Sequence, residues 1–197
     1  GDLRGFTFTG AASIVSLLGR GDEALSYLKT ALDLFLPNTM YKEAGPVMES
    51  PLAAAAVIND LLLQSWGDYL WIFPAVPTKW QDVVFHDLRA EGGFLVSAVR
   101  EQNKTSCIRI KSLAGEPCRI KVDFEGEIKL LSRRMLELKN LGADLYEIDL
   151  KKDEEVFLFS SECGSQIRIK PLTFQKELCN IFGGKKPWRR YGIPFQD

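Results

Sequence analysis

The sequence has very little histidine and methionine and almost no net charge. A single histidine, His86, and three methionines occur in 197 residues, and 25 basic residues stand against 26 acidic ones. A formal net charge of -1 creates no field that would attract polyanions, so nucleic-acid binding is disfavoured. His86 has no second histidine with which to form a metal site, and a surface or interdomain hydrogen bond is the role that we expect for it.

Cysteines are few and widely spaced. The four of them form no CxxC pair and stand at Cys107, Cys118, Cys163 and Cys179. Zinc sites usually need closely spaced cysteines or cysteines with several histidines, and disulfide-rich scaffolds need more of them in a shorter chain. We therefore predict buried thiols on strands, with no disulfide framework, no metal site and no cofactor.

Long apolar runs are also missing. The longest, residues 52–63, contains Asn59 and Asp60 and is too short to cross a bilayer. Nothing at the start resembles a signal peptide, so we expect no membrane partner. The chain opens at Gly1 without methionine and enters helical periodicity almost at once, and we expect it to be cut from a longer protein.

The first third of the chain has the apolar spacing of helices. One helix is expected to end at Gly19, and a second to run from a cap at Asp22 to Pro37. A third is expected to open with Ser50 as its cap and Pro51 at the first helical position. This third helix is apolar on nearly every side, which predicts that other helices enclose it. The two preceding helices can hardly do so.

From Trp66 onward the pattern changes to short alternating runs separated by turn residues, as in strands. Such spacing is typical of an antiparallel β-sandwich. We therefore predict a helical segment over residues 1–66 and a β-sandwich domain with an irregular tail over residues 67–197. The candidate strands are residues 69–73, 83–88, 94–99, 107–111, 118–124, 127–131, 145–150, 155–159 and 166–170.

Two of these strands are predicted to form a hairpin with one apolar and one basic face. The turn at 112–116 would join residues 107–111 to residues 118–124. Its polar face is expected to be the solvated side of a half-buried sheet, and an alternative is a surface for an acidic polysaccharide. The basic side chains of that face are Arg109, Lys111, Arg119 and Lys121.

Several motifs together resemble glycoside hydrolase family 95, the α-L-fucosidase and α-L-galactosidase family. The resemblance covers about residues 14–120 and becomes thin beyond them. Its motifs are Leu36-Pro37-Asn38, Pro46-Val47-Met48-Glu49-Ser50, Leu61-Leu62-Leu63-Gln64-Ser65, Ile72-Phe73-Pro74-Ala75-Val76-Pro77 with Trp80, and Leu88-Arg89-Ala90-Glu91-Gly92-Gly93-Phe94.

The resemblance implies a fold and a place within a larger protein. The family has an N-terminal β-domain, an (α/α)6 barrel with the active site, and a C-terminal β-domain. The chain would then be an α+β multidomain fragment, with a helical hairpin and one further helix from an incomplete (α/α)6 barrel followed by an antiparallel β-sandwich. The resemblance also implies a bacterial parent protein that is secreted or periplasmic.

The same resemblance points to two candidate site residues. Inverting glycosidases use a general acid and a group that activates water. In the family the acid and the water-handling asparagines lie upstream of this segment, and an aspartate that assists them aligns with Glu49. Glu43 takes the place of a family histidine and is a candidate substrate-binding residue. Ser50-Pro51 replaces the family's Gly-Asn. The alternatives are a solvated carboxylate before a helix for Glu49 and a solvated loop carboxylate for Glu43.

The leading hypothesis is a C-terminal fragment of such a glycosidase, inactive alone because it lacks the general acid. Its partners would be carbohydrate in the parent protein, the upstream barrel segment, and a second copy of the chain bound through exposed helix faces. One rival is a module that binds glycan or a protein through its basic face or through the aromatic tail at 183–191. Another is a domain that only braces the barrel.

Overall fold

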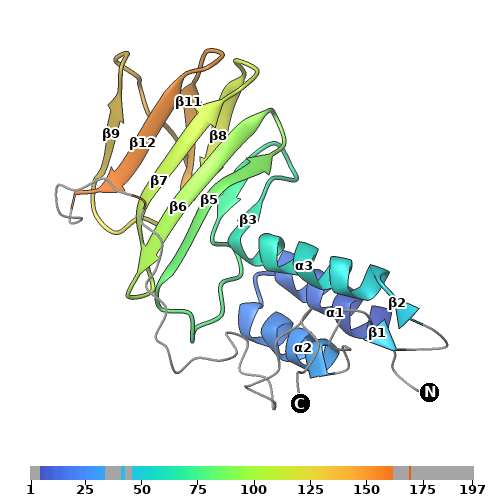
Figure 1. The fold of residues 1–197 in the computed structure, drawn as a ribbon. Helices are drawn as coiled ribbons and strands as arrows, with labels where there is room; N and C mark the ends of the chain where they lie inside the picture. The colour runs from blue at the N-terminus through green and yellow to red at the C-terminus, as the bar shows by residue number, and fades with distance from the viewer. Residues whose placement is uncertain (1–4, 34–40, 43–45, 162–168, 170–197) are drawn as a thin grey trace, which may run out of the picture. The chain divides into compact units, whose positions relative to one another are not determined.

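The computed structural model describes residues 5–33, 41–42, 46–161 and 169, and the chain forms two compact units (Figure 1). The helical unit contains the described residues up to Leu61 together with Pro74–Pro77. The β unit contains Leu62–Phe73 and the described residues from Thr78 onward. Helices and largely antiparallel sheets make this a mixed α+β fold, as predicted.

The helical unit begins with a helical hairpin. Helix α1 spans Gly5–Leu17 and helix α2 spans Gly21–Asp33, and the two pack against each other. Gly19 adopts a positive φ of 75°, and the N–H groups of Gly19 and Arg20 donate to the carbonyls of Ser16 and Val15. This is the glycine-terminated helix end that the sequence predicts. Helix α3, Glu49–Leu62, and the short strands β1, Tyr41–Lys42, and β2, Pro46–Val47, follow.

Two helix starts differ from the predictions. The N–H of Ala24 donates to the carbonyl of Arg20, and that of Leu52 donates to the carbonyl of Met48, so Arg20 and Met48 precede the helices. The predicted caps are therefore wrong, because Asp22 and Ser50 are each the second residue of a helix. Several neighbouring polar residues can each serve as a start signal, and the sequence does not rank them.

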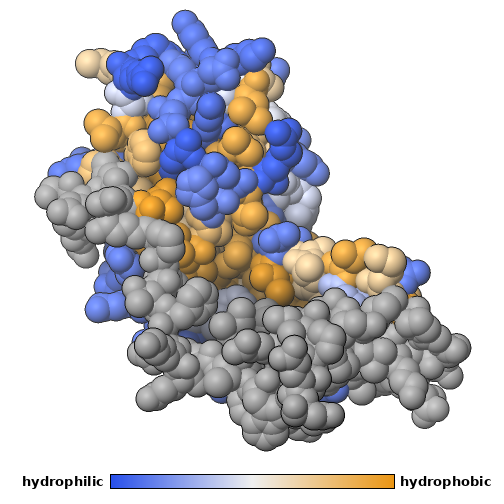
Figure 2. All heavy atoms as spheres, in the orientation of Figure 1, coloured by the Kyte–Doolittle hydropathy of each residue, from blue (hydrophilic) through white to orange (hydrophobic). Residues whose placement is uncertain are grey.

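Apolar side chains remain exposed on helix α1, which has no charged residue. They are Phe6, Ile14 and Leu17, exposed by 54%, 62% and 39% of their surface, and Leu18 directly after the helix is exposed by 64%. On α3, Leu52 is exposed by 62%, and Figure 2 shows apolar residues along this helix. Helices that are apolar on several sides are normally covered by neighbours.

The β unit consists of two five-stranded sheets, both visible in Figure 1. All neighbouring strands are antiparallel except β4 and β8. The first sheet has the order β10 (Lys139–Gly142), β11 (Leu145–Asp149), β8 (Pro117–Lys121), β4 (Leu70–Ile72) and β3 (Leu63–Gln64). The second has the order β5 (Val83–Ala90), β6 (Phe94–Glu101), β7 (Lys104–Ser112), β12 (Glu155–Ser160) and β9 (Ile128–Ser132).

Alternating residues of both sheets form the core of the β unit, as period-2 alternation requires. Each sheet therefore has an apolar face that is withdrawn from water, which is consistent with a β-sandwich. The side chains with no exposed surface include Cys118, Ile120 and Ile148 from the first sheet and Val96, Ile108, Ile110, Val156 and Leu158 from the second.

The predicted hairpin between residues 107–111 and 118–124 is wrong. Strand β7 pairs with β6 and β12, whereas β8 pairs with β11 and β4 in the other sheet. The segment 113–116 therefore carries the chain from one sheet to the other. The expected basic face is divided in the same way, since Arg109 and Lys111 belong to β7 while Arg119 and Lys121 belong to β8. Alternation defines the buried side of a strand but not its partner.

Most other predicted strands correspond to observed ones, with bounds that differ by a few residues. The last of them, residues 166–170, and the aromatic tail lie almost entirely outside the described residues. Four observed strands have no predicted counterpart: the two-residue strands β1, β2 and β3, and β10, whose residues 139–142 are all exposed and show no alternation. None of the described helices is long and apolar enough to span a membrane.

Candidate functional site

The structure describes one of the two residues that the sequence singles out. Glu43 lies outside the described residues. Glu49 is the first residue of α3, is exposed, and accepts a hydrogen bond of 3.1 Å from the N–H of Met48 through its carboxylate. A negative charge at this end of a helix is favoured by the helix dipole. This arrangement fits a helix-start carboxylate and leaves the carboxylate accessible.

Ser50 beside it is a buried polar residue. Its side chain is fully withdrawn from water, and its Oγ has no hydrogen-bond partner among the described residues. A buried hydroxyl without a partner costs free energy, so such groups are uncommon in folded proteins. The hydroxyl at the α3 start therefore does not act as the helix cap that the sequence suggests.

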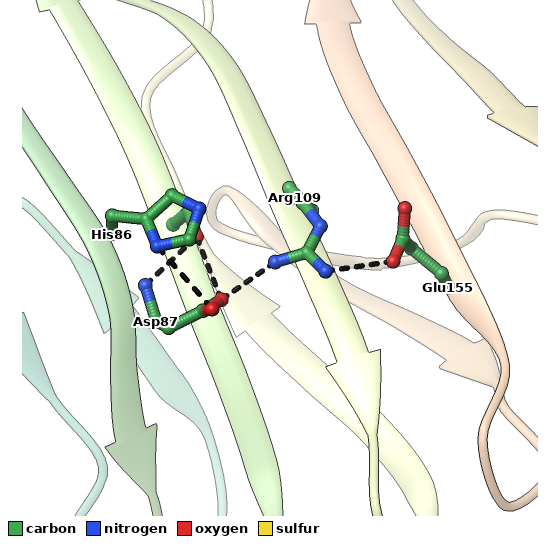
Figure 3. Close-up of polar contacts among 5 residues, drawn as sticks. His86, Asp87, Arg109 and Glu155 are labelled. Carbon is green, nitrogen blue, oxygen red and sulfur yellow. Dashed lines mark hydrogen bonds and ion pairs between the residues drawn. The ribbon is translucent and has the colours of Figure 1, made fainter. Parts of the chain in front are cut away.

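A row of polar side chains crosses the outer face of the second sheet (Figure 3). The guanidinium of Arg109 on β7 donates to Asp87 at 2.6 Å and to Glu155 at 2.8 Å, and so bridges β5 and β12. Asp87 lies in a bulge of β5 with a positive φ of 52°, and its N–H donates to Ser97 Oγ at 2.9 Å. His86 Nδ1 is 3.3 Å from the Asp87 carboxylate. We call these residues the Arg109 row.

The Arg109 row contains the residue types of a serine hydrolase, but not their order. In such an enzyme the hydroxyl donates to the imidazole, which is oriented by the carboxylate. Here the Ser97 hydroxyl donates to Asp87 Oδ1 at 3.3 Å, and Ser97 is buried. The imidazole of His86 also contacts Asp87. The triad order is not formed, because the serine hydroxyl donates to the carboxylate and not to the imidazole. The row is a structural brace across four strands.

Charge pairing within this row fixes the state of Arg109. The hydrogen bond to Glu155, followed by the attraction of Glu155 and Asp87, raises the pKa of Arg109 above its ordinary value. Arg109 therefore stays positively charged and paired with these two carboxylates. The sequence suggests Arg109 as part of a binding face, but its carboxylate partners are 22 and 46 residues away along the chain. No local signal could reveal them.

The buried cysteines are not candidates for nucleophilic chemistry. Cys107 on β7 and Cys118 on β8 are buried and withdrawn from water, as predicted for these two. Burial raises the pKa of Cys118 to about 12, so the reactive thiolate is scarce at neutral pH. Within the described ranges, no group of three or more histidine, cysteine or acidic residues could hold a metal ion.

The surface of the β unit has a hollow that we call the Arg119 groove, with a volume of about 510 Å³. Arg119 Nε donates to Glu147 at 2.9 Å in its wall. Binding sites for small molecules are usually concave and of several hundred Å³. The lining residues are Ser65, Asp68, Tyr69, Leu70, Glu91, Gly92, Phe94, Glu116, Pro117, Arg119 and Glu147.

A second hollow of about 720 Å³ is the Arg134 hollow. Arg134 donates to both carboxylate oxygens of Glu154, at 2.7 and 2.9 Å, and to the carbonyl of Asp149. Two carboxylates that line this hollow, those of Glu154 and Glu155, are therefore paired with arginines of the chain itself, because Glu155 is bonded to Arg109. The lining residues are Lys111, Leu131, Ser132, Arg133, Arg134, Lys152, Asp153, Glu154, Glu155 and Phe157.

The Arg134 hollow gives a testable pH dependence. The hydrogen bonds from Arg134 and from the N–H of Lys151 lower the pKa of Glu154 from 4.5 to about 2. A carboxyl whose pKa is lowered in the folded state stabilises the fold above its unfolded pKa, and this stabilisation is lost as the pH falls from 4.5 to about 2. We expect Arg134→Ala to lower the melting temperature at neutral pH, and the difference from the unmodified protein to shrink towards pH 2.

Thermal unfolding followed by circular dichroism between pH 7 and pH 2 measures this difference. Arg133→Ala is the matched control, because Arg133 lines the same hollow but forms no ion pair with a described residue. Its melting-temperature difference should not depend on pH. A constant difference for Arg134→Ala across the pH range would contradict the predicted role of Glu154.

The described part of the β unit thus consists of two five-stranded sheets, a polar row whose arginine is paired with carboxylates of the chain itself, and two surface hollows. Comparison with known protein families gives one match. Residues 64–158 match glycoside hydrolase family 95, C-terminal domain, the family that the sequence motifs resemble. No curated protein matches the chain.

Proposed function

We propose that the chain is the C-terminal part of a glycosidase that hydrolyses α-linked L-fucose or L-galactose with inversion. The match of residues 64–158 to the C-terminal domain of glycoside hydrolase family 95 is the observation that carries this proposal. A domain of that kind belongs to a larger protein that binds carbohydrate. In the proposal the β unit braces a catalytic helical domain, and the chain alone lacks the general acid.

The helical unit supports this proposal. Helix α1 carries no charge and exposes Phe6 and Ile14, while α3 exposes Leu52. Such faces are costly in water, at roughly 25 cal/mol per Å² of apolar surface, and helices that carry them are normally enclosed. We propose that they are the last helices of an incomplete (α/α)6 barrel and that an upstream barrel segment of the parent protein covers them.

Glu49 is the proposed contribution of this chain to catalysis. Its carboxylate is exposed at the start of α3 and lies where the helix dipole favours a negative charge. In the proposal this carboxylate helps to orient the attacking water in an inverting mechanism. Ser50 and Pro51 follow it in place of the family's Gly-Asn, so the proposal includes a site whose shape differs from that of its relatives.

The first test is the activity of the purified chain. We expect no release of 4-nitrophenol from its α-L-fucoside or α-L-galactoside above the rate in buffer, because general acid catalysis contributes about 10²–10⁴-fold and its residue is absent. In a protein extended through the upstream barrel, Glu49→Gln should lower kcat by about 10²-fold if the carboxylate acts on the water.

Asp22→Asn is the matched control in the extended protein, because Asp22 is an acidic residue in the first turn of α2 as Glu49 is in the first turn of α3. It should leave kcat unchanged. Hydrolysis of either glycoside by the 197-residue chain itself would overturn the proposal that the general acid lies upstream of this chain. If Glu49→Gln retains full kcat in the extended protein, Glu49 does not take part in catalysis.

The exposed helix faces also predict self-association of the isolated chain. Contiguous apolar surface in water favours dimers when its natural cover is missing. Sedimentation velocity should show a concentration-dependent dimer, and the double variant Ile14→Glu/Leu52→Glu should shift it to monomer because both side chains are 62% exposed. Leu131→Glu is the control, exposed by 54% in the β unit. A monomer at all concentrations would contradict this prediction.

A further inference from the structure

We propose that the Arg119 groove binds a neutral glycan, so that this β unit holds carbohydrate independently of the catalytic site. The groove is formed wholly within the β unit, by the β3–β4 connection, the β5–β6 turn, the start of β8, and β11. Its volume of about 510 Å³ suits one or two sugar rings, since ligand sites commonly measure about 300–1,000 Å³. The inference goes beyond the proposed hydrolysis.

Charged groups in the groove are held in place and face solvent. Arg119 Nε donates to Glu147 Oε2 at 2.9 Å, and Lys139 Nζ lies 3.4 Å from the other carboxylate oxygen of Glu147. Arg119 is 49% exposed, and its two terminal nitrogens form no hydrogen bond with the described residues. A guanidinium fixed at one nitrogen therefore presents two further donors to a ligand.

The groove also has an excess of hydrogen-bond acceptors. Asp68, Glu91 and Glu116 line it in addition to Glu147, and against them stands only Arg119 among the basic lining residues. Glu91 and Glu116 form no ion pair with a described residue, and no three acidic side chains in the described part are grouped to hold a metal. Sugar hydroxyls are donors that match such acceptors, whereas an acidic sugar would be repelled.

Neighbouring contacts make the groove rigid. The N–H of Glu91 donates to Ser65 Oγ at 3.1 Å, which ties the β5–β6 turn to the end of β3. The ring of Phe94 lies against Gly92, where a methyl group would approach it to 2.6 Å. The half-buried ring of Tyr69 adds an apolar surface of the kind on which amphipathic ligands rest. A preformed groove loses little entropy when a ligand binds.

The test uses three oligosaccharides that share a lactose core: 2′-fucosyllactose, lactose and 3′-sialyllactose. The choice of fucose rests on the proposed function, whereas the expected preference for neutral sugars rests on the charge of the groove. The purified 197-residue chain is titrated with each and followed by two-dimensional amide NMR. With a neutral sugar we expect saturable chemical-shift changes at the amides of Gly92 and Glu116 and a dissociation constant in the millimolar range. 3′-Sialyllactose should bind at least tenfold more weakly.

Arg119→Ala should weaken the binding of the neutral sugar by about tenfold or more, because hydrogen bonds to a charged group are lost. Arg133→Ala in the Arg134 hollow is the matched control and should bind as the unmodified chain does. The amide spectrum outside the groove reports whether each variant is folded. The inference is overturned if no sugar shifts the groove amides, if 3′-sialyllactose binds as well as the neutral sugars, or if folded Arg119→Ala binds normally.

These outcomes are separable from those of the hydrolysis proposal. An extended protein that hydrolyses fucosides, with no sugar binding to the groove of this chain, would overturn the groove alone. Binding at the groove, with no hydrolysis by the extended protein, would retain the groove and overturn the proposed activity.

Discussion

Leu158→Ala is expected to lower the free energy of unfolding of the β unit by about 2–5 kcal/mol. Leu158 lies on β12, a central strand between β7 and β9, and its side chain has no exposed surface. The substitution removes buried methyl groups and leaves a cavity that the strands on both sides cannot easily fill. Chemical denaturation followed by tryptophan fluorescence and circular dichroism would measure the loss.

Leu131→Ala provides the comparison, with the same chemical change on the neighbouring strand β9. Its side chain is 54% exposed, so the free energy of unfolding should change by no more than about 0.5 kcal/mol. Equal losses for the two variants would show that β12 and β9 do not have the burial described, and would contradict the arrangement of the second sheet.

Gly115→Ala is expected to be the other strongly destabilising change. Gly115 has a φ of 89°, and a methyl group there would approach the backbone nitrogen of Lys152 to 2.7 Å. The strained backbone costs about 1–3 kcal/mol, and the overpacking against a backbone that cannot move freely costs a further ~1–3 kcal/mol. Equilibrium denaturation of the purified variant measures the total loss in the free energy of unfolding, which is the sum of the two contributions.

Gly142→Ala separates the two effects. Gly142 has a similar φ of 91°, but nothing lies within 4 Å of the added methyl group. The free energy of unfolding of this variant should therefore fall only by the part that is due to backbone strain. If Gly115→Ala were no more destabilised than Gly142→Ala, the close packing of the segment 113–116 on the β11–β12 turn would be refuted.

This close packing explains why the hairpin prediction fails. The N–H of Asp153 donates to the Ser112 carbonyl at 2.8 Å, and the N–H of Ser112 donates to the carbonyl of Glu154 at 2.9 Å. Two connections between the sheets, β7 to β8 and β11 to β12, thus run together. A glycine-containing turn between two alternating segments is also the usual signature of a hairpin. The contacts that distinguish a crossover between sheets from a hairpin join residues about 40 positions apart in the chain.

The candidate site was only partly predictable. Motifs around residues 46–65 lead to Glu49 through family resemblance, and the structure places it at the start of α3. The Arg119 groove carries no sequence signal, because Ser65, Glu91, Arg119 and Glu147 come from four separate segments. Arg119 itself is visible in the sequence only as one member of a basic face that the fold then divides between two sheets.

The sequence by itself determines where most of the helices and longer strands form, because apolar spacing, glycine at Gly19 and turn residues act over a few positions. It also carries the ordered motifs on which the family match of residues 64–158 depends. The tertiary structure alone decides which strands become neighbours, that Arg109 is occupied by Asp87 and Glu155, and where grooves open. These depend on contacts between distant residues, and side-chain periodicity specifies only which face of an element is buried.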